Sequence, residues 1–87
     1  MENSITFYGA TWCGDCKRSK TYLDEHHIAY TDINIDKVHG AAEIVKKINH
    51  GLASIPTIIF PNGEILVEPT NQKLSETIAA NKKALHL

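Results

Sequence analysis

Clustered and alternating apolar residues mark regular structure along the first part of the chain. Residues 5–8 (Ile-Thr-Phe-Tyr) are β-branched and aromatic and end at Gly9, which predicts a short buried strand. Residues 14–26 contain no proline and space their apolar side chains as a helix does. Residues 30–35 then alternate polar and apolar side chains, as in a half-buried strand.

A second helix is predicted after that strand. We expect Asp36 to cap its start and Gly51 to stand at its C-terminal cap. Between these two residues one apolar stripe recurs at helical spacing, formed by Ala41, Ile44, Val45 and Ile48.

The last third of the chain predicts a β-hairpin and a third helix. Residues 57–60 form an apolar run typical of a central strand, and residues 64–67 follow after Pro-Asn-Gly, a strong hairpin signal. Thr70 or Asn71 is then expected to cap a helix. Its inner side carries Leu74, Ile78 and Leu85.

The predicted order is therefore β-α-β-α-β-β-α. The first two strands flank a helix and should be parallel with a right-handed crossover, whereas the last two form an antiparallel hairpin. The fold class is α/β, a mixed four-stranded sheet flanked by three helices in the thioredoxin-like arrangement.

Composition limits the classes of function. The 87 residues suffice for one domain, residues 1–87, and 43% apolar with 22% charged residues is an ordinary globular mixture. A net charge of −1 does not favour nucleic-acid binding, and the longest apolar run, residues 58–60, is too short to cross a membrane. Because residues 1–4 begin no signal peptide, we expect a cytoplasmic monomer with no nucleic-acid or membrane partner.

Cys13 and Cys16 are the two cysteines, and both fall where a strand gives way to a helix. Three residues apart, their sulfurs can come within disulfide reach. Cys13 meets the unpaired N–H groups and the positive end of the helix dipole, which favour its thiolate. Cys16 lies deeper and should keep a higher pKa. Cys13 is therefore predicted to attack a substrate disulfide, and Cys16 to displace the reduced product.

The residues around the pair modify this chemistry. Gly14 leaves room for a substrate chain. Asp15 suits a first helical turn, but its charge opposes a negative sulfur on Cys13. Asp15 could also repel acidic substrates or pass a proton to the second cysteine, while Lys17 and Arg18 add positive charge nearby.

Half a zinc site is the alternative use of a Cys-x-x-Cys pair. No pair of histidines has the spacing of a zinc finger, so we expect no bound metal or cofactor and histidines that face solvent. The five histidines are His26, His27, His39, His50 and His86.

Pro56 stands just before the predicted central strand, where proline would remove a ladder hydrogen bond. A cis Ile55–Pro56 bond facing Cys13 would explain it, because the Ile55 backbone could then pair with an extended substrate. An ordinary trans proline that opens the strand is the alternative.

In combination these motifs resemble the glutaredoxin branch of the thioredoxin-like superfamily. The likeness runs from about residue 5 to residue 84 and rests on residues 6–8, 12–16, 55–57 and 61–63. It implies a thiol–disulfide oxidoreductase that acts on disulfide-containing or S-thiolated proteins, with Cys13 taking up a low-molecular-weight thiol.

The chain departs from members of that branch that use glutathione. It lacks their lysine before the first cysteine, and in place of their Gly-Gly-x-Asp stretch it carries residues 67–71, where Glu68 would repel a carboxylate. The lead-in and tail look more like mycoredoxins, which serve mycothiol, although those more often carry an aromatic residue in place of Asp15. Mycothiol or glutathione is thus the expected cosubstrate.

The resemblance also suggests which residues bind substrate. Thr57, the Ile55 backbone, and Thr70 and Asn71 at the start of the last helix are candidates for holding the small thiol. Trp12 would offer an apolar platform for the incoming substrate or cover the sheet edge.

Two other functions stay open. One is a glutaredoxin-like electron donor to ribonucleotide reductase, recharged by a thioredoxin-reductase-like flavoenzyme. The other is an iron–sulfur or metal-binding module in which Cys13 ligates a cluster with an external thiol across a dimer; many relatives of that kind carry serine where this chain has Cys16.

Overall fold

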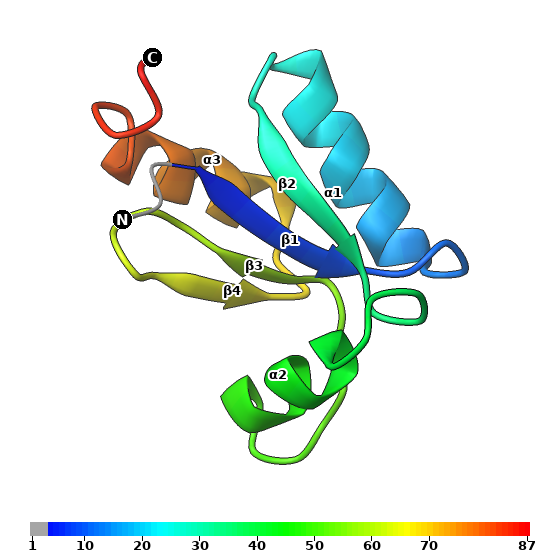
Figure 1. Ribbon diagram of the computed structural model, residues 1–87. Coiled ribbons are helices and arrows are strands. Elements are labelled where there is room, and N and C mark those ends of the chain that lie inside the picture. The colour runs from blue at the N-terminus through cyan, green and yellow to red at the C-terminus, as the bar shows by residue number, and fades with distance from the viewer. Residues whose placement is uncertain (1–3) are drawn as a thin grey trace.

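Strands and helices follow one another in the predicted order, in a computed structural model that describes residues 4–87 (Figure 1). Residues 1–3 lie outside the described residues. The predicted domain bounds, 1–87, and the prediction that residues 1–4 begin no signal peptide both include them. The elements are β1 Ile5–Gly9, α1 Gly14–Glu25, β2 Tyr30–Asn34, α2 Ala41–Ile48, β3 Thr57–Ile59, β4 Ile65–Val67 and α3 Asn71–Ala80. None of the helices in residues 4–87 has the length and apolar character that a membrane crossing needs.

The sheet has the strand order β2-β1-β3-β4. β1 is parallel to β2 and antiparallel to β3, and β3 is antiparallel to β4, which confirms the predicted mixed sheet. Tyr8 near the end of β1 is paired with Ile33 of β2 and Thr57 of β3, and Thr57 is paired with Val67 of β4. The loops that follow β1, β2 and β4 and the loop that precedes β3 therefore meet at one edge of the sheet.

The core lies around the two central strands. Phe7 and Tyr8 of β1 and Thr57 and Ile58 of β3 are all buried, so both strands have covered faces, as predicted. Helices α1 and α3 contact each other, while α2 lies apart from them at the foot of the sheet in Figure 1.

The predicted start of α2 at Asp36 is wrong. The Asn34 side chain accepts a 2.9 Å hydrogen bond from the Asp36 N–H, and the chain turns through residues 35–40 until Gly40, at φ 82°, precedes the helix. The amide oxygen of Asn34 thus competes locally with helix formation. Ile44 is also not part of the buried stripe, since 45% of it is exposed.

The end of α2 differs by one residue from the prediction. His50 and Gly51 both have positive φ, 56° and 99°, and the N–H of Gly51 donates a 2.7 Å hydrogen bond to the carbonyl of Lys46. This is the hydrogen bond of a Schellman end, in which His50 takes the position directly after the helix cap and Gly51 the one beyond it.

The last helix starts as predicted and ends early. Thr70 is its N-cap, accepting a 3.1 Å hydrogen bond from the Lys73 N–H. The helix stops at Ala80, so the prediction that Leu85 lies on the helix is wrong. Leu85 packs against the core from the turns that follow the helix.

Asn81 fixes that end of the helix against the hairpin. Its side chain is buried, donates a 2.8 Å hydrogen bond to the Thr77 carbonyl and accepts a 2.9 Å hydrogen bond from the Asn62 N–H. We expect Asn81→Ala to lower the free energy of unfolding by about 2 kcal/mol, because it strips partners from two backbone groups. Urea denaturation measures this loss. The exposed neighbour Lys82→Ala is the control, and an equal, small effect of both substitutions would contradict the assignment.

Candidate active site

The start of α1 holds the two sulfurs. Cys13 is the N-cap residue of the helix, and its Sγ accepts a 3.1 Å hydrogen bond from the Cys16 N–H. The first N–H groups of a helix lack partners within it, and here the cap sulfur supplies one. Both cysteines are free thiols and buried, Cys13 at 7% and Cys16 at 1% exposure.

Cys16 has the environment of a protonated thiol. The pKa of Cys16 is raised to about 12, chiefly by burial and then by the hydrogen bond with Cys13 and the charge of Cys13, while the Ala10 backbone and Lys20 oppose the shift. The predicted higher pKa of this cysteine is confirmed.

Gly9 makes room for the buried Cys16 sulfur, a role that was not predicted from the sequence. A Cβ added at Gly9 would lie 3.0 Å from Cys16 Sγ and 3.0 Å from the Phe7 ring. The signal was a glycine that ends a strand directly before the cysteine loop, where close backbone approach is common.

The loop before β3 faces the first cysteine. The Ile55–Pro56 peptide bond is cis, as predicted, and the Cys13 thiol lies 3.9 Å from the Ile55 carbonyl, to which it donates. Thr57 is fully buried; its hydroxyl donates to the Ser54 carbonyl at 2.7 Å. That hydroxyl also accepts from the Asn49 side chain at 3.0 Å, so it is engaged within the protein.

A groove of about 440 Å³ lies between the start of α1 and the start of α3. Its lining residues are Asp15, Arg18, Glu68, Pro69, Thr70 and Asn71. It therefore brings together three residues predicted to bind substrate, Asp15, Thr70 and Asn71.

Arg18 closes one side of this groove. Its guanidinium donates to the Asn71 side-chain oxygen at 2.5 Å and to the Pro69 carbonyl at 2.6 Å, and its Nε lies 3.9 Å from the Asp15 carboxylate. The carboxylates of Asp15 and Glu68 are exposed. The groove thus holds two carboxylates and one guanidinium, and the guanidinium is already bound to protein oxygens. Its net charge is negative.

Trp12 lies at the surface. It is 69% exposed, and its indole N–H donates a 2.7 Å hydrogen bond to the Asp36 carboxylate. An indole this exposed does not cover the sheet edge. Gly14 is also exposed, and apart from its chain neighbours and the backbone of its own helix no heavy atom lies within 4 Å of the position that a Cβ would take.

The remaining polar groups do not converge on the cysteines. All five histidines are exposed, and no group of three or more His, Cys, Asp or Glu residues in the described part of the chain could hold a metal ion.

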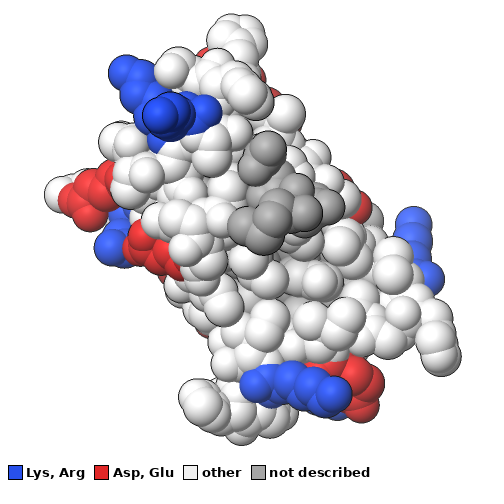
Figure 2. Space-filling view, turned by 60° about the vertical axis from the view of Figure 1, so that its left-hand side comes forward, with Lys and Arg blue, Asp and Glu red and all other residues white. Residues whose placement is uncertain are grey.

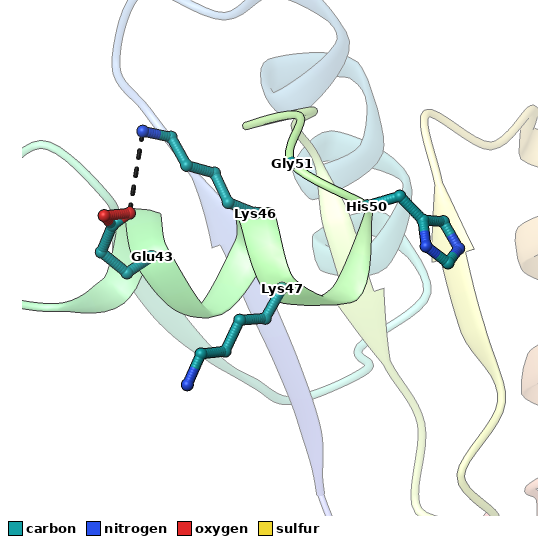
Figure 3. A pocket seen from close by; sticks show the side chains of 5 residues that line it. All are labelled: Glu43, Lys46, Lys47, His50 and Gly51. Carbon is teal, nitrogen blue, oxygen red and sulfur yellow. Dashed lines mark ion pairs between the residues drawn. The ribbon is translucent and has the colours of Figure 1, made fainter.

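On the face in Figure 2 basic and acidic side chains are interspersed. A hollow of about 480 Å³ lies on α2, where Lys46 pairs with Glu43 and the side chains of Lys47 and His50 point away from each other (Figure 3).

Comparison with known proteins gives a consistent match. The Glutaredoxin family model matches residues 5–66. A candidate glutaredoxin of Mycobacterium tuberculosis is 39% identical over 67 residues, which cover 77% of this chain and 80% of that protein. Mycoredoxin 1 of Corynebacterium glutamicum is 31% identical over 77 residues, 88% of this chain and 91% of that protein.

Two further relatives agree. The glutaredoxin-like protein NrdH of Lactococcus lactis is 40% identical over 55 residues, 62% of this chain and 72% of that protein. The crystal structure of a glutaredoxin from Archaeoglobus fulgidus superposes with a TM-score of 0.71 at 25% identity, covering 86% of this chain and 85% of that one.

The raised pKa of Cys16 predicts how alkylation depends on pH. A Cys13→Ser variant loses the charge and the thiol of Cys13 but keeps burial, the largest cause of the raised pKa. We therefore expect iodoacetamide to label Cys16 more slowly in the folded variant than in the unfolded one, with the rate rising only above the ordinary thiol pKa of 9.0. The sign follows because a raised pKa keeps the thiol protonated up to a higher pH. In urea the same thiol should titrate near 9.0. Mass spectrometry follows both reactions, and equal rates in folded and unfolded protein would contradict the prediction.

Proposed function

This chain belongs to the glutaredoxin family of thiol–disulfide oxidoreductases, and we propose that it reduces mixed disulfides between proteins and a low-molecular-weight thiol, with Cys13 as the attacking sulfur. The observation that carries the proposal is the contrast between the two thiols. Cys13 stands at the helix start and its sulfur accepts a hydrogen bond from the Cys16 N–H, whereas Cys16 is more deeply buried and its raised pKa keeps the thiol protonated. An attacking thiol needs the first environment.

The proposed reaction is two successive exchanges. The Cys13 thiolate attacks the small-thiol sulfur of a protein mixed disulfide, so that a Cys13–thiol disulfide forms and the protein sulfur leaves and takes up a proton. A second molecule of the small thiol, as its thiolate, then attacks the bound thiol sulfur. This step releases the disulfide of the small thiol and restores the Cys13 thiolate.

Cys16 offers an internal alternative to the second exchange. Once Cys13 is in a mixed disulfide, its negative charge is gone, and one cause of the raised pKa of Cys16 disappears with it. Burial, the largest cause, remains. Attack of Cys16 on Cys13 would then expel the small thiol as thiolate and leave a Cys13–Cys16 disulfide, but slowly, which favours the external thiol.

The groove and the cis-proline loop are the proposed binding sites for the two parts of the substrate. The small thiol would lie in the groove at Asp15, Thr70 and Asn71, on the α3 side of Cys13. The Ile55 backbone beside Pro56, with Thr57 supporting the loop through its hydroxyl, would pair with an extended segment.

The negative charge of the groove supports a small-thiol cosubstrate that carries no carboxylate. Glutathione carries two carboxylates, which Asp15 and Glu68 would repel, and Arg18 is already bound to Asn71 and Pro69. Mycothiol, a sugar-based thiol without carboxylates, avoids this repulsion. The similarity to mycoredoxin 1 supports the same choice.

A second candidate is an electron donor to ribonucleotide reductase that a thioredoxin-reductase-like flavoenzyme recharges. The dithiol pair and the lack of a free cation among the groove residues favour it, since such a donor needs both sulfurs and no small-thiol site. The similarity to the glutaredoxin-like protein NrdH is in keeping with it.

Cysteine variants separate the two candidates. We expect Cys13→Ser to abolish reduction of a mycothiolated protein, and Cys16→Ser to retain at least half of the activity with excess mycothiol, because an external thiol completes the cycle. Release of mycothiol disulfide measures turnover. The dithiol donor would instead be established by two results together: both variants lose activity, and NADPH with a thioredoxin reductase reduces the Cys13–Cys16 disulfide of the wild-type protein.

Neutralising the groove should relax the choice of thiol. In an Asp15→Asn, Glu68→Gln variant we expect kcat/KM for a glutathione mixed disulfide to rise about fivefold at low ionic strength, and that for the mycothiol substrate to stay constant. The gain should shrink in 0.5 M salt. Glu25→Gln, on the far end of α1, is the control, and a similar gain there would show that only net charge matters.

A further inference from the structure

The bond between Trp12 and Asp36 restrains a side chain that would otherwise be free. A tryptophan that is 69% exposed has little packing to select its rotamer. Here the indole N–H donates to a carboxylate at 2.7 Å, and hydrogen bonds to an ionised acceptor are among the stronger ones. In the described residues the Asp36 carboxylate makes no ion pair within 4.0 Å, so it is available to the indole.

The position of the acceptor is set by the sheet. The Ile35 N–H donates to the Gly9 carbonyl at 2.9 Å, which extends the pairing of β1 and β2 beyond the strands. The Asn34 side chain then holds the Asp36 N–H at 2.9 Å. Asp36 is therefore held next to the end of β1. That strand ends at Gly9, three residues before Trp12. In Figure 1 the loops after β1 and β2 lie side by side.

The indole and the groove lie on different sides of Cys13. In the sheet β2 flanks β1 on one side, and β3 and β4 lie on the other. Asp36 follows β2, whereas Glu68 and Thr70 follow β4. The mixed disulfide that Cys13 attacks has two halves. With the small thiol in the groove and a segment of the protein half paired with the Ile55 backbone, the rest of the protein half can extend past Cys13 toward the β2 side.

We propose that Asp36 is a positioning residue that holds Trp12 as an apolar wall for the protein half of the mixed disulfide. This rests on the proposed function. The exposed indole is apolar, and Val38, two residues beyond Asp36, is also 48% exposed, so the expected occupant is an apolar segment next to the S-thiolated cysteine of the substrate protein. Asp36 touches neither sulfur and acts through the indole alone.

Two substrates that share the same small thiol test this role. One is a mycothiolated protein, and the other is the mixed disulfide of mycothiol with 2-mercaptoethanol, which has no protein half. In Asp36→Ala we expect KM for the protein substrate to rise about fivefold with kcat nearly constant, because a restrained aromatic contact is lost. KM for the small substrate should stay within twofold of the wild type.

Conservative and control variants guard against a merely structural effect. Asp36→Asn keeps an acceptor oxygen and should restore most of the protein-substrate KM, while Glu43→Ala removes an exposed carboxylate from α2 and should change nothing. Trp12 is the single tryptophan, so acrylamide quenching reports on it directly and should increase in Asp36→Ala.

The outcomes distinguish this role from the proposed function. A wild-type protein that reduces neither substrate would overturn the proposed function and the role of Asp36 with it. A wild-type protein that reduces both, with an Asp36→Ala variant that raises KM equally for both or for neither, would overturn the positioning role alone.

Discussion

The first turn of α1 begins with backbone N–H groups that have no partner within the helix, and the site is organised around that requirement. The N-cap residue is a cysteine, so a sulfur takes the place that a serine or aspartate oxygen usually fills. The cap stands at the end of its helix, while the residue three positions on turns toward the sheet. One local rule therefore gives the Cys13 sulfur an N–H donor and places Cys16 deeper, at 1% exposure against 7% for Cys13.

The sheet register determines what surrounds this helix start. Because β1 is parallel to β2 and antiparallel to β3, and β4 runs back beside β3, four loops converge on the edge from which α1 departs. The loop before β3 brings the Ile55 carbonyl to Cys13, and the loop after β4 brings the groove. Residues up to 58 positions apart thus form one site through strand pairing.

Local signals predicted the order of the elements and the position of the two cysteines at the start of a helix, because the forces behind these features act over a few residues. The apolar run before Gly9, the Asn-Gly turn and the cap at Thr70 are of this kind. The predicted cap at Asp36 failed because the Asn34 side chain holds the Asp36 N–H in a turn. The contact of the Asp36 carboxylate with Trp12, 24 positions away, is one that no spacing along the chain reveals. Gly9 and Arg18 likewise gain their roles from partners in other elements, Cys16 for the first and Asn71 for the second.

The same long-range contacts explain how a small domain can treat the two halves of one disulfide differently. Arg18 ties α1 to the start of α3 and leaves an acidic groove on one side of Cys13. On the other side, the Asp36 carboxylate accepts a hydrogen bond from the Trp12 indole, whose exposed ring is apolar. Charge selects among small thiols, whose charged groups differ, whereas an apolar wall accepts protein segments of many sequences. In the proposed function, such a site would combine selectivity for the small thiol with tolerance for the protein.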